Sequence, residues 1–90
     1  MIRQHIIFSG RVQGVGFRYR AVNAARMYRV GGWVRNLPDG RVEAELEGTE
    51  DSISQVILAV ERGTYVSIDN MWVRNIPATG ETSFYVKDEE

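Results

Sequence analysis

The chain has 90 residues, enough for one modest hydrophobic core, so we expect a single domain over residues 1–90 without an internal linker. A formal net charge of −1 excludes a broad surface for nucleic acid or anionic membranes, because such surfaces need a clear positive excess. The absence of cysteine excludes disulfides, thiol chemistry and zinc–sulfur sites. Since the sequence shows neither a signal peptide nor an apolar run of spanning length, we expect a cytoplasmic protein.

The first third of the chain predicts one strand and one helix. Residues 2–9 are rich in Ile and Phe and stop at Gly10, which is typical of a strand. From about Arg18 to Val30, small and aromatic residues recur every three or four positions among polar ones, which predicts an amphipathic helix. The pair Gly31-Gly32 would end that helix.

A hairpin follows. Residues 33–36 predict a short strand, Leu37-Pro38-Asp39-Gly40 a turn, and residues 41–47 a second strand, because polar and apolar residues alternate along them.

The remainder predicts a second helix and two strands. Thr49 can cap a helix over residues 50–62, with Gly63 at its end. Residues 66–76 then predict a strand, and Thr82–Lys87 a short last one.

This order of elements, β-α-β-β-α-β with a tail strand, is the ferredoxin-like plan, an α+β sandwich with two helices on one face of an antiparallel sheet. In that plan the first two strands run in the same direction, so their C-terminal ends lie at the same edge. The loop over residues 10–18 leaves the first strand there, and Asn36 closes the second. An amide side chain therefore lies beside the loop, where it can hold water because it both donates and accepts hydrogen bonds.

Residues 10–18, Gly-Arg-Val-Gln-Gly-Val-Gly-Phe-Arg, have the features of a phosphate site. Their three glycines allow positive φ, so successive N–H groups can converge on an anion. The following helix points its positive end at the same place, and Arg18 adds a planar guanidinium that can hold two phosphate oxygens. The alternative for this segment alone is an ordinary turn between strand and helix.

Two segments resemble the signatures of the acylphosphatase family. Residues 10–18 resemble its Gly-x-Val-Gln-Gly-Val-x-Phe-Arg segment, and Gly32-Trp33-Val34-Arg35-Asn36, with Gly40-x-Val42 and Gly48, resembles its second segment. The resemblance implies a hydrolase acting on acid anhydrides, which splits the carboxyl–phosphate bond of acyl phosphates without a metal, a cofactor or a covalent intermediate.

The resemblance also implies a role for individual residues. Arg18 would bind the phosphoryl group and Asn36 would orient the attacking water. Backbone amides would complete the phosphate cradle, contributed by Gln13, Gly14, Val15, Gly16 and Phe17. The expected partners are a small-molecule acyl phosphate and inorganic phosphate, which is both product and competing ligand. We expect a monomer that binds neither nucleic acid nor a membrane.

Two alternatives stay open for the function. A ferredoxin-like domain can be a non-catalytic module that binds an anion or a small molecule. Similar domains also begin larger carbamoyl-transfer proteins, although this chain reads as free-standing. RNA binding is disfavoured, because the sheet face of residues 41–47 carries Glu43, Glu45 and Glu47, which would repel a phosphate backbone.

Some side chains have two interpretations. The three glutamates predict a solvated sheet face rather than a cation site. We expect His5 to be an ordinary surface residue rather than a base or a metal ligand. Gln13 either contacts ligand or closes the loop, and Tyr19 and Trp33 either pack beside an acyl group or are structural.

Overall fold

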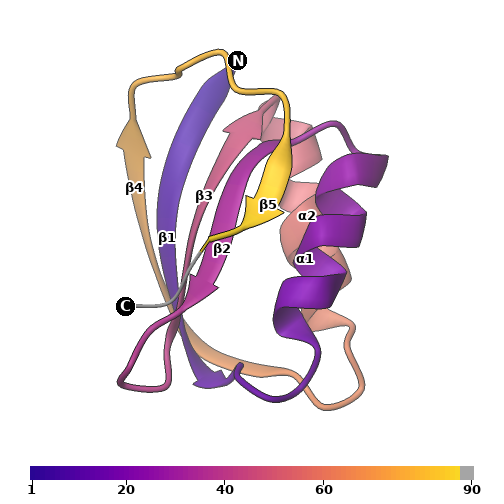
Figure 1. Ribbon diagram of the computed structural model, residues 1–90, viewed down its shortest axis with the longest axis vertical. Helices are drawn as coiled ribbons and strands as arrows, with labels where there is room; N and C mark the ends of the chain where they lie inside the picture. The colour runs from indigo at the N-terminus through magenta and orange to yellow at the C-terminus, as the bar shows by residue number, and fades with distance from the viewer. Residues whose placement is uncertain (88–90) are drawn as a thin grey trace.

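The computed structural model describes residues 1–87 and shows two helices on one side of a five-stranded sheet (Figure 1). The elements in chain order are β1 (Ile2–Arg11), α1 (Phe17–Met27), β2 (Gly31–Asn36), β3 (Val42–Gly48), α2 (Glu50–Glu61), β4 (Ser67–Ile76) and β5 (Phe84–Val86). The strand order is β4-β1-β3-β2-β5, with β2 and β5 parallel and the other neighbours antiparallel. The predicted ferredoxin-like fold is confirmed, with the tail strand added to β2 at the edge of the sheet.

The core lies between the helices and one face of the sheet. Ile6, Val34 and Val42 are fully buried on that face. Alanines at positions 21, 24 and 25 of α1 are also buried, and their small side chains let the helix approach the sheet closely. Within residues 1–87, no helix is long and apolar enough to cross a membrane.

Both helix starts follow from local chemistry. Thr49 caps α2 as predicted, because its hydroxyl accepts a hydrogen bond from the Ser52 amide at 3.1 Å. The N-cap of α1 is Gly16, in the left-handed conformation with φ of +81°. Within residues 1–87, no side chain caps that helix. The amides of its first turn therefore stay available at its positive end.

The predicted end of the first helix is wrong. α1 ends at Met27 rather than at Val30, and Arg29 has a φ of +58°, which turns the chain back toward the sheet. Gly31 and Gly32 belong to β2. A Cβ at Gly32 would lie 1.8 Å from the Glu45 carbonyl oxygen, and one at Gly31 would lie 2.1 Å from that of Glu81. Both glycines thus allow a neighbouring backbone to approach closely, β3 at Gly32 and the segment before β5 at Gly31, so they do not mark a helix end.

The predicted end of the first strand is also wrong. β1 continues through Gly10 to Arg11, with a register shift between Ser9 and Gly10 in its pairing with β4. A Cβ at Gly10 would lie 2.3 Å from the Ser67 carbonyl oxygen. The glycine therefore admits a β-bulge rather than stopping the strand. At the other end of the chain, the predicted strand Thr82–Lys87 shortens to Phe84–Val86.

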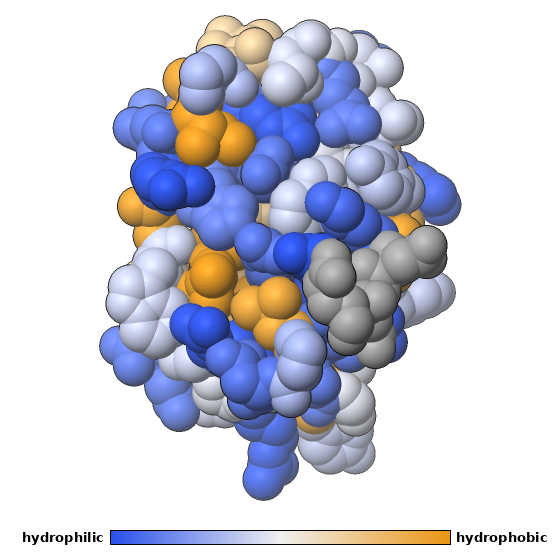
Figure 2. Space-filling model, turned by 60° about the vertical axis from the view of Figure 1, so that its left-hand side comes forward, coloured by the Kyte–Doolittle hydropathy of each residue, from blue (hydrophilic) through white to orange (hydrophobic). Residues whose placement is uncertain are grey.

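The sheet face away from the helices is mostly hydrophilic, with small separate apolar areas (Figure 2). It is not simply solvated, which corrects the interpretation of the three glutamates. Arg3 and Glu47 are each only 4% exposed. The Arg3 guanidinium pairs with Glu45 at 2.8 Å and with Glu47 at 3.0 Å. Glu43 pairs with His5 and with Arg35. The acidic row of β3 is therefore matched by cations of the same protein.

Candidate active site

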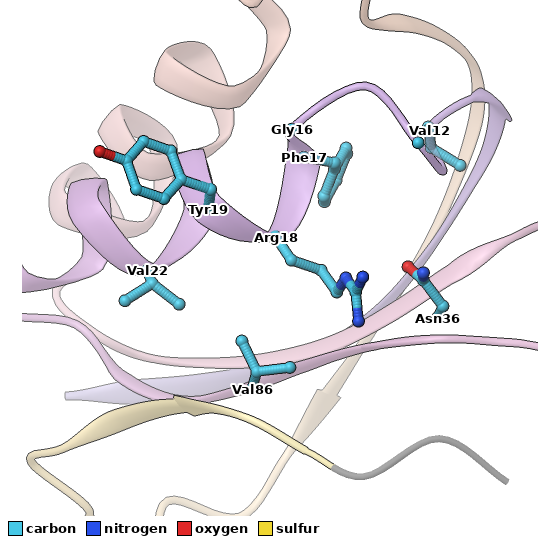
Figure 3. Close-up of a pocket in the computed structure, with 9 residues that line it drawn as sticks. Val12, Gly16, Phe17, Arg18, Tyr19, Val22, Asn36 and Val86 are labelled. Carbon is cyan, nitrogen blue, oxygen red and sulfur yellow. The ribbon is translucent and has the colours of Figure 1, made fainter.

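The two segments that the sequence singled out meet at one end of the sheet. β1 and β2 are both antiparallel to β3, so they run in the same direction and end at the same edge. A pocket of about 470 Å³ opens there, between the start of α1, the end of β2 and β5. Its lining residues are Val12, Gly14, Gly16, Phe17, Arg18, Tyr19, Val22, Asn36 and Val86 (Figure 3).

The loop into α1 has the conformation that its glycines allow. Gly14 has a φ of +71° and Gly16 a φ of +81°, a region that other residues adopt only with strain. A Cβ at either position would meet nothing within 4 Å. These glycines are therefore needed for backbone conformation and not for room inside the protein. Their bare backbone leaves amides accessible to an anion in the pocket.

Two buried side chains hold the ends of this loop. Val12 is 1% exposed and Phe17 is 3% exposed. The Phe17 ring packs edge-on against Phe8, with ring centroids 4.9 Å apart. Since both ends are fixed in the core, the loop between them has a defined path. A pre-formed loop can hold an anion without first being ordered.

Arg18 and Asn36 come together at the polar end of the pocket. Arg18 extends from the first turn of α1, and its guanidinium points toward the Asn36 amide (Figure 3). Asn36 is the last residue of β2. Its Oδ1 is buried and accepts no hydrogen bond from residues 1–87, where it is the one buried side-chain nitrogen or oxygen without a partner. An unsatisfied buried oxygen costs about 1–3 kcal/mol, so it is suited to accept a hydrogen bond from a water or a ligand.

The side chain of Gln13 bonds to the hairpin, in agreement with the interpretation that it closes the loop. Its Nε2 donates to the carbonyl oxygens of Leu37 at 2.7 Å and Arg41 at 2.9 Å. Val15 packs partly buried against the core. The side chains of Gln13 and Val15 thus lie outside the pocket lining, whereas Gly14, Gly16 and Phe17 contribute to it.

The apolar side of the pocket was only partly expected. Tyr19 lines it, but Trp33 lies on the other face of the sheet, with the Lys87 ammonium 4.3 Å from its ring centroid. Val22 and Val86 were missed. Val22 lies four residues after Arg18, so helical spacing could have placed it on the same side of α1. Val86 reaches the pocket only because β5 pairs with β2, and no sequence pattern announces that pairing.

His5 lies away from the pocket. Its Nε2 is 2.7 Å from a carboxylate oxygen of Glu43, on the charged face of the sheet. Burial opposes the charge on Glu43, but hydrogen bonds with His5 and Arg35 outweigh burial and lower the pKa of that carboxyl. Over residues 1–87, no three His, Asp or Glu side chains gather as a metal site would require.

Comparison with known proteins gives a consistent result. The acylphosphatase family model matches residues 4–86. An acylphosphatase from Roseiflexus sp. is 45% identical over 82 residues, which cover 90% of this chain and 88% of that protein. An acylphosphatase from Trichormus variabilis is 54% identical over 57 residues. That match covers 63% of this chain and spans only 56% of the relative's length.

Solved structures agree with the sequence relatives. The crystal structure of acylphosphatase from Bacillus subtilis superposes with a TM-score of 0.88 at 36% identity, over 98% of this chain and all (100%) of that one. The matched region includes both the loop into α1 and the strand that ends at Asn36. The chain therefore belongs to the acylphosphatase family.

Proposed function

We propose that this protein hydrolyses acyl phosphates to a carboxylate and inorganic phosphate. One observation carries the proposal: the buried Oδ1 of Asn36, which has no hydrogen-bond partner among residues 1–87, shares a pocket with Arg18. Arg18 and the loop amides would hold the phosphoryl group, and Asn36 would orient the attacking water in line with the bond that breaks. Membership of the acylphosphatase family supports the same reaction.

The reaction mainly requires that the protein orient the reactants and stabilise the negative charge of the transition state. Phosphoryl transfer passes through a loose transition state whose charge is spread over the equatorial oxygens. The planar guanidinium of Arg18 can contact two of these oxygens, and the positive end of α1 adds amide donors. Asn36 is too weak a base to remove a full proton. It need only aim the water, because a carboxylate is a good leaving group.

The rest of the pocket suits the acyl part of such a substrate. Tyr19 and Val22 of α1 and Val86 of β5 line the side away from Asn36 (Figure 3). These side chains can contact a hydrocarbon group while the phosphate stays at the polar end. The pocket thus combines one position that can bind an anion with an apolar wall, which together suit a small acyl phosphate.

We propose that the reaction needs no metal ion, since Arg18 and the helix terminus would supply the positive charge. The test uses purified protein with acetyl phosphate or benzoyl phosphate in excess chelator. We expect unchanged turnover, competitive inhibition by inorganic phosphate, and little action on p-nitrophenyl phosphate, whose leaving group is poorer. Loss of activity on chelation that a divalent ion restores would contradict metal independence. Phosphate binding without any turnover would favour the non-catalytic binding module.

A further inference from the structure

Gln13 joins the loop before Arg18 to the hairpin that follows Asn36. Its Nε2 donates two hydrogen bonds, at 2.7 Å to the Leu37 carbonyl and at 2.9 Å to the Arg41 carbonyl. Both partners are carbonyl oxygens, so only the nitrogen of the side-chain amide can face them. The orientation of the Gln13 amide is therefore fixed by its partners.

The two acceptors lie at the neck of the hairpin turn. The Leu37 amide donates to the Arg41 carbonyl at 2.8 Å, and the Gly40 amide donates to the Leu37 carbonyl at 3.2 Å. Gln13 thus adds a bond to each of the two carbonyls that already close the turn. Leu37 follows Asn36 directly in the chain, so fixing this neck also fixes the backbone that carries the Asn36 amide.

Asn36 depends on its backbone for its position. Its Oδ1 accepts no hydrogen bond within residues 1–87, so its side-chain oxygen is not held by a partner there. On the other side of the connection, Gln13 stands between the buried Val12 and Gly14, whose φ is +71°. A single side chain therefore links the bend of the glycine loop to the strand end that presents Asn36.

We propose that Gln13 is a positioning residue for catalysis, which sets the place of Asn36 relative to the phosphate loop. This proposal rests on the proposed hydrolysis of acyl phosphates. Because Gln13 faces the hairpin, it acts through Asn36 and leaves the substrate phosphate to Arg18 and the loop amides. A displacement of about 1 Å in a reacting geometry can reduce a rate by about 100-fold, so loss of the connection should reduce turnover more than binding.

The first experiment compares Gln13→Met with Gln4→Met. The Gln4 Nε2 donates to Asn75 Oδ1 at 3.2 Å between β1 and β4, so the control loses an amide of the same size outside the pocket. We expect Gln13→Met to lower kcat for benzoyl phosphate about tenfold, with KM and inhibition by inorganic phosphate within about twofold. The control should keep kcat, KM and phosphate inhibition within the same limits. Unchanged kcat per folded molecule in Gln13→Met would overturn the proposal.

A second substitution, Gln13→Glu, keeps the shape but sets a carboxylate against two carbonyl oxygens. At neutral pH it has no proton to donate, whereas its protonated form can donate to one carbonyl. We therefore expect the ratio of its kcat to that of the wild type to rise as the pH falls. A ratio that stays constant with pH would show that the hydrogen bonds to the hairpin do not control turnover.

The decisive experiment adds Gln13→Met to Asn36→Ala. If Gln13 acts through Asn36, the double variant should have a kcat within about twofold of Asn36→Ala alone. A further tenfold loss would overturn the positioning role while leaving the proposed hydrolysis intact. A wild-type protein without turnover of any acyl phosphate would instead contradict the proposed function itself, so the two failures are distinguishable.

Discussion

The two ends of the sheet differ in how completely their polar groups are satisfied. At the start of β1, Arg3 pairs with Glu45, Glu47 and Glu81, and burial of the cation is matched by carboxylates. At the opposite end, the buried Oδ1 of Asn36 has no hydrogen-bond donor within residues 1–87, and the adjoining loop has glycines at positive φ. We therefore expect the first end to serve stability and the second end to bind a ligand.

The end of the sheet around Arg3 also binds the segment that connects β4 with β5. The segment over residues 77–83 leads from β4 at one edge to β5 at the other (Figure 1). Glu47 accepts hydrogen bonds there from the amides of Thr79 at 2.8 Å and Gly80 at 2.6 Å, besides the one from Arg3. Burial opposes the charge on Arg3, but its hydrogen bonds to Glu45 and Glu47 raise the pKa of the guanidinium. Glu47 thus holds both the Arg3 guanidinium and the backbone of the segment over residues 77–83.

Arg18→Lys should give the largest effect, at the end of the sheet that carries Asn36. Lysine keeps the charge but cannot make the paired contacts of a planar guanidinium. We expect kcat/KM for benzoyl phosphate to fall by at least about 100-fold, the scale for loss of one transition-state charge contact. Inorganic phosphate should also inhibit less well. Near-normal kinetics and phosphate inhibition in this variant would contradict the role of Arg18.

Asn36→Ala should separate positioning from binding. We expect turnover to fall about 100-fold with little change in phosphate inhibition, because Asn36 is proposed to hold the water. Thermal stability should be unchanged or slightly raised, since the substitution removes a buried oxygen that accepts no hydrogen bond from the described part of the chain. Asn36→Asp should both slow turnover and weaken phosphate binding, most clearly at low salt.

The outcome for Asn36 is read from melting temperature and kinetics measured together. A lowered melting temperature with normal turnover per folded molecule would show that Asn36 only shapes the hairpin. That result would make this end of the sheet structural, like the end around Arg3.

The same contrast explains what could be predicted from the sequence. The order of elements follows from local sequence patterns. The proximity of Arg18 and Asn36 follows from the parallel direction of the two strands that lead to them. The roles of Arg3 and Glu47 do not follow in this way, because they depend on the contact of Glu47 with the distant segment over residues 77–83. Val86 likewise needs the pairing of β5 with β2. The role of Gly31 and Gly32 could not be predicted, because the close approach of a backbone segment distant in the sequence leaves no trace in a single sequence.

Arg3→Met should affect stability and spare the site. The substitution leaves Glu47 without its cation, which should lower the free energy of unfolding clearly more than a substitution at an exposed arginine does. Turnover per folded molecule should stay within about twofold, because the buried Phe84 still fixes β5 beside the pocket. Arg62→Met, at an exposed arginine, is the matched control and should change stability little. A loss of turnover equal to that of Arg18→Lys would show that the two ends are not separable.

The smallest effect is a dependence of stability on pH, which arises at the end of the sheet around Arg3 and Glu47. The Thr79 amide is the main cause that lowers the pKa of Glu47 from its ordinary 4.5 to about 2, against burial and with help from Arg3 and the Gly80 amide. Because the folded pKa is the lower one, the stabilisation is complete above about pH 4.5 and is lost as the pH falls toward about 2.

Urea denaturation of the wild type and of Glu47→Gln between about pH 6 and pH 2 tests this assignment. The wild type should be the more stable protein at about pH 6, and the difference should shrink toward pH 2, where the Glu47 carboxyl becomes protonated. Glu61→Gln removes an exposed carboxylate at the end of α2 and should instead keep the pH slope of the wild type. If the difference in the free energy of unfolding between the wild type and Glu47→Gln stayed constant across this range, Glu47 would stabilise the segment over residues 77–83 by packing rather than by its charge.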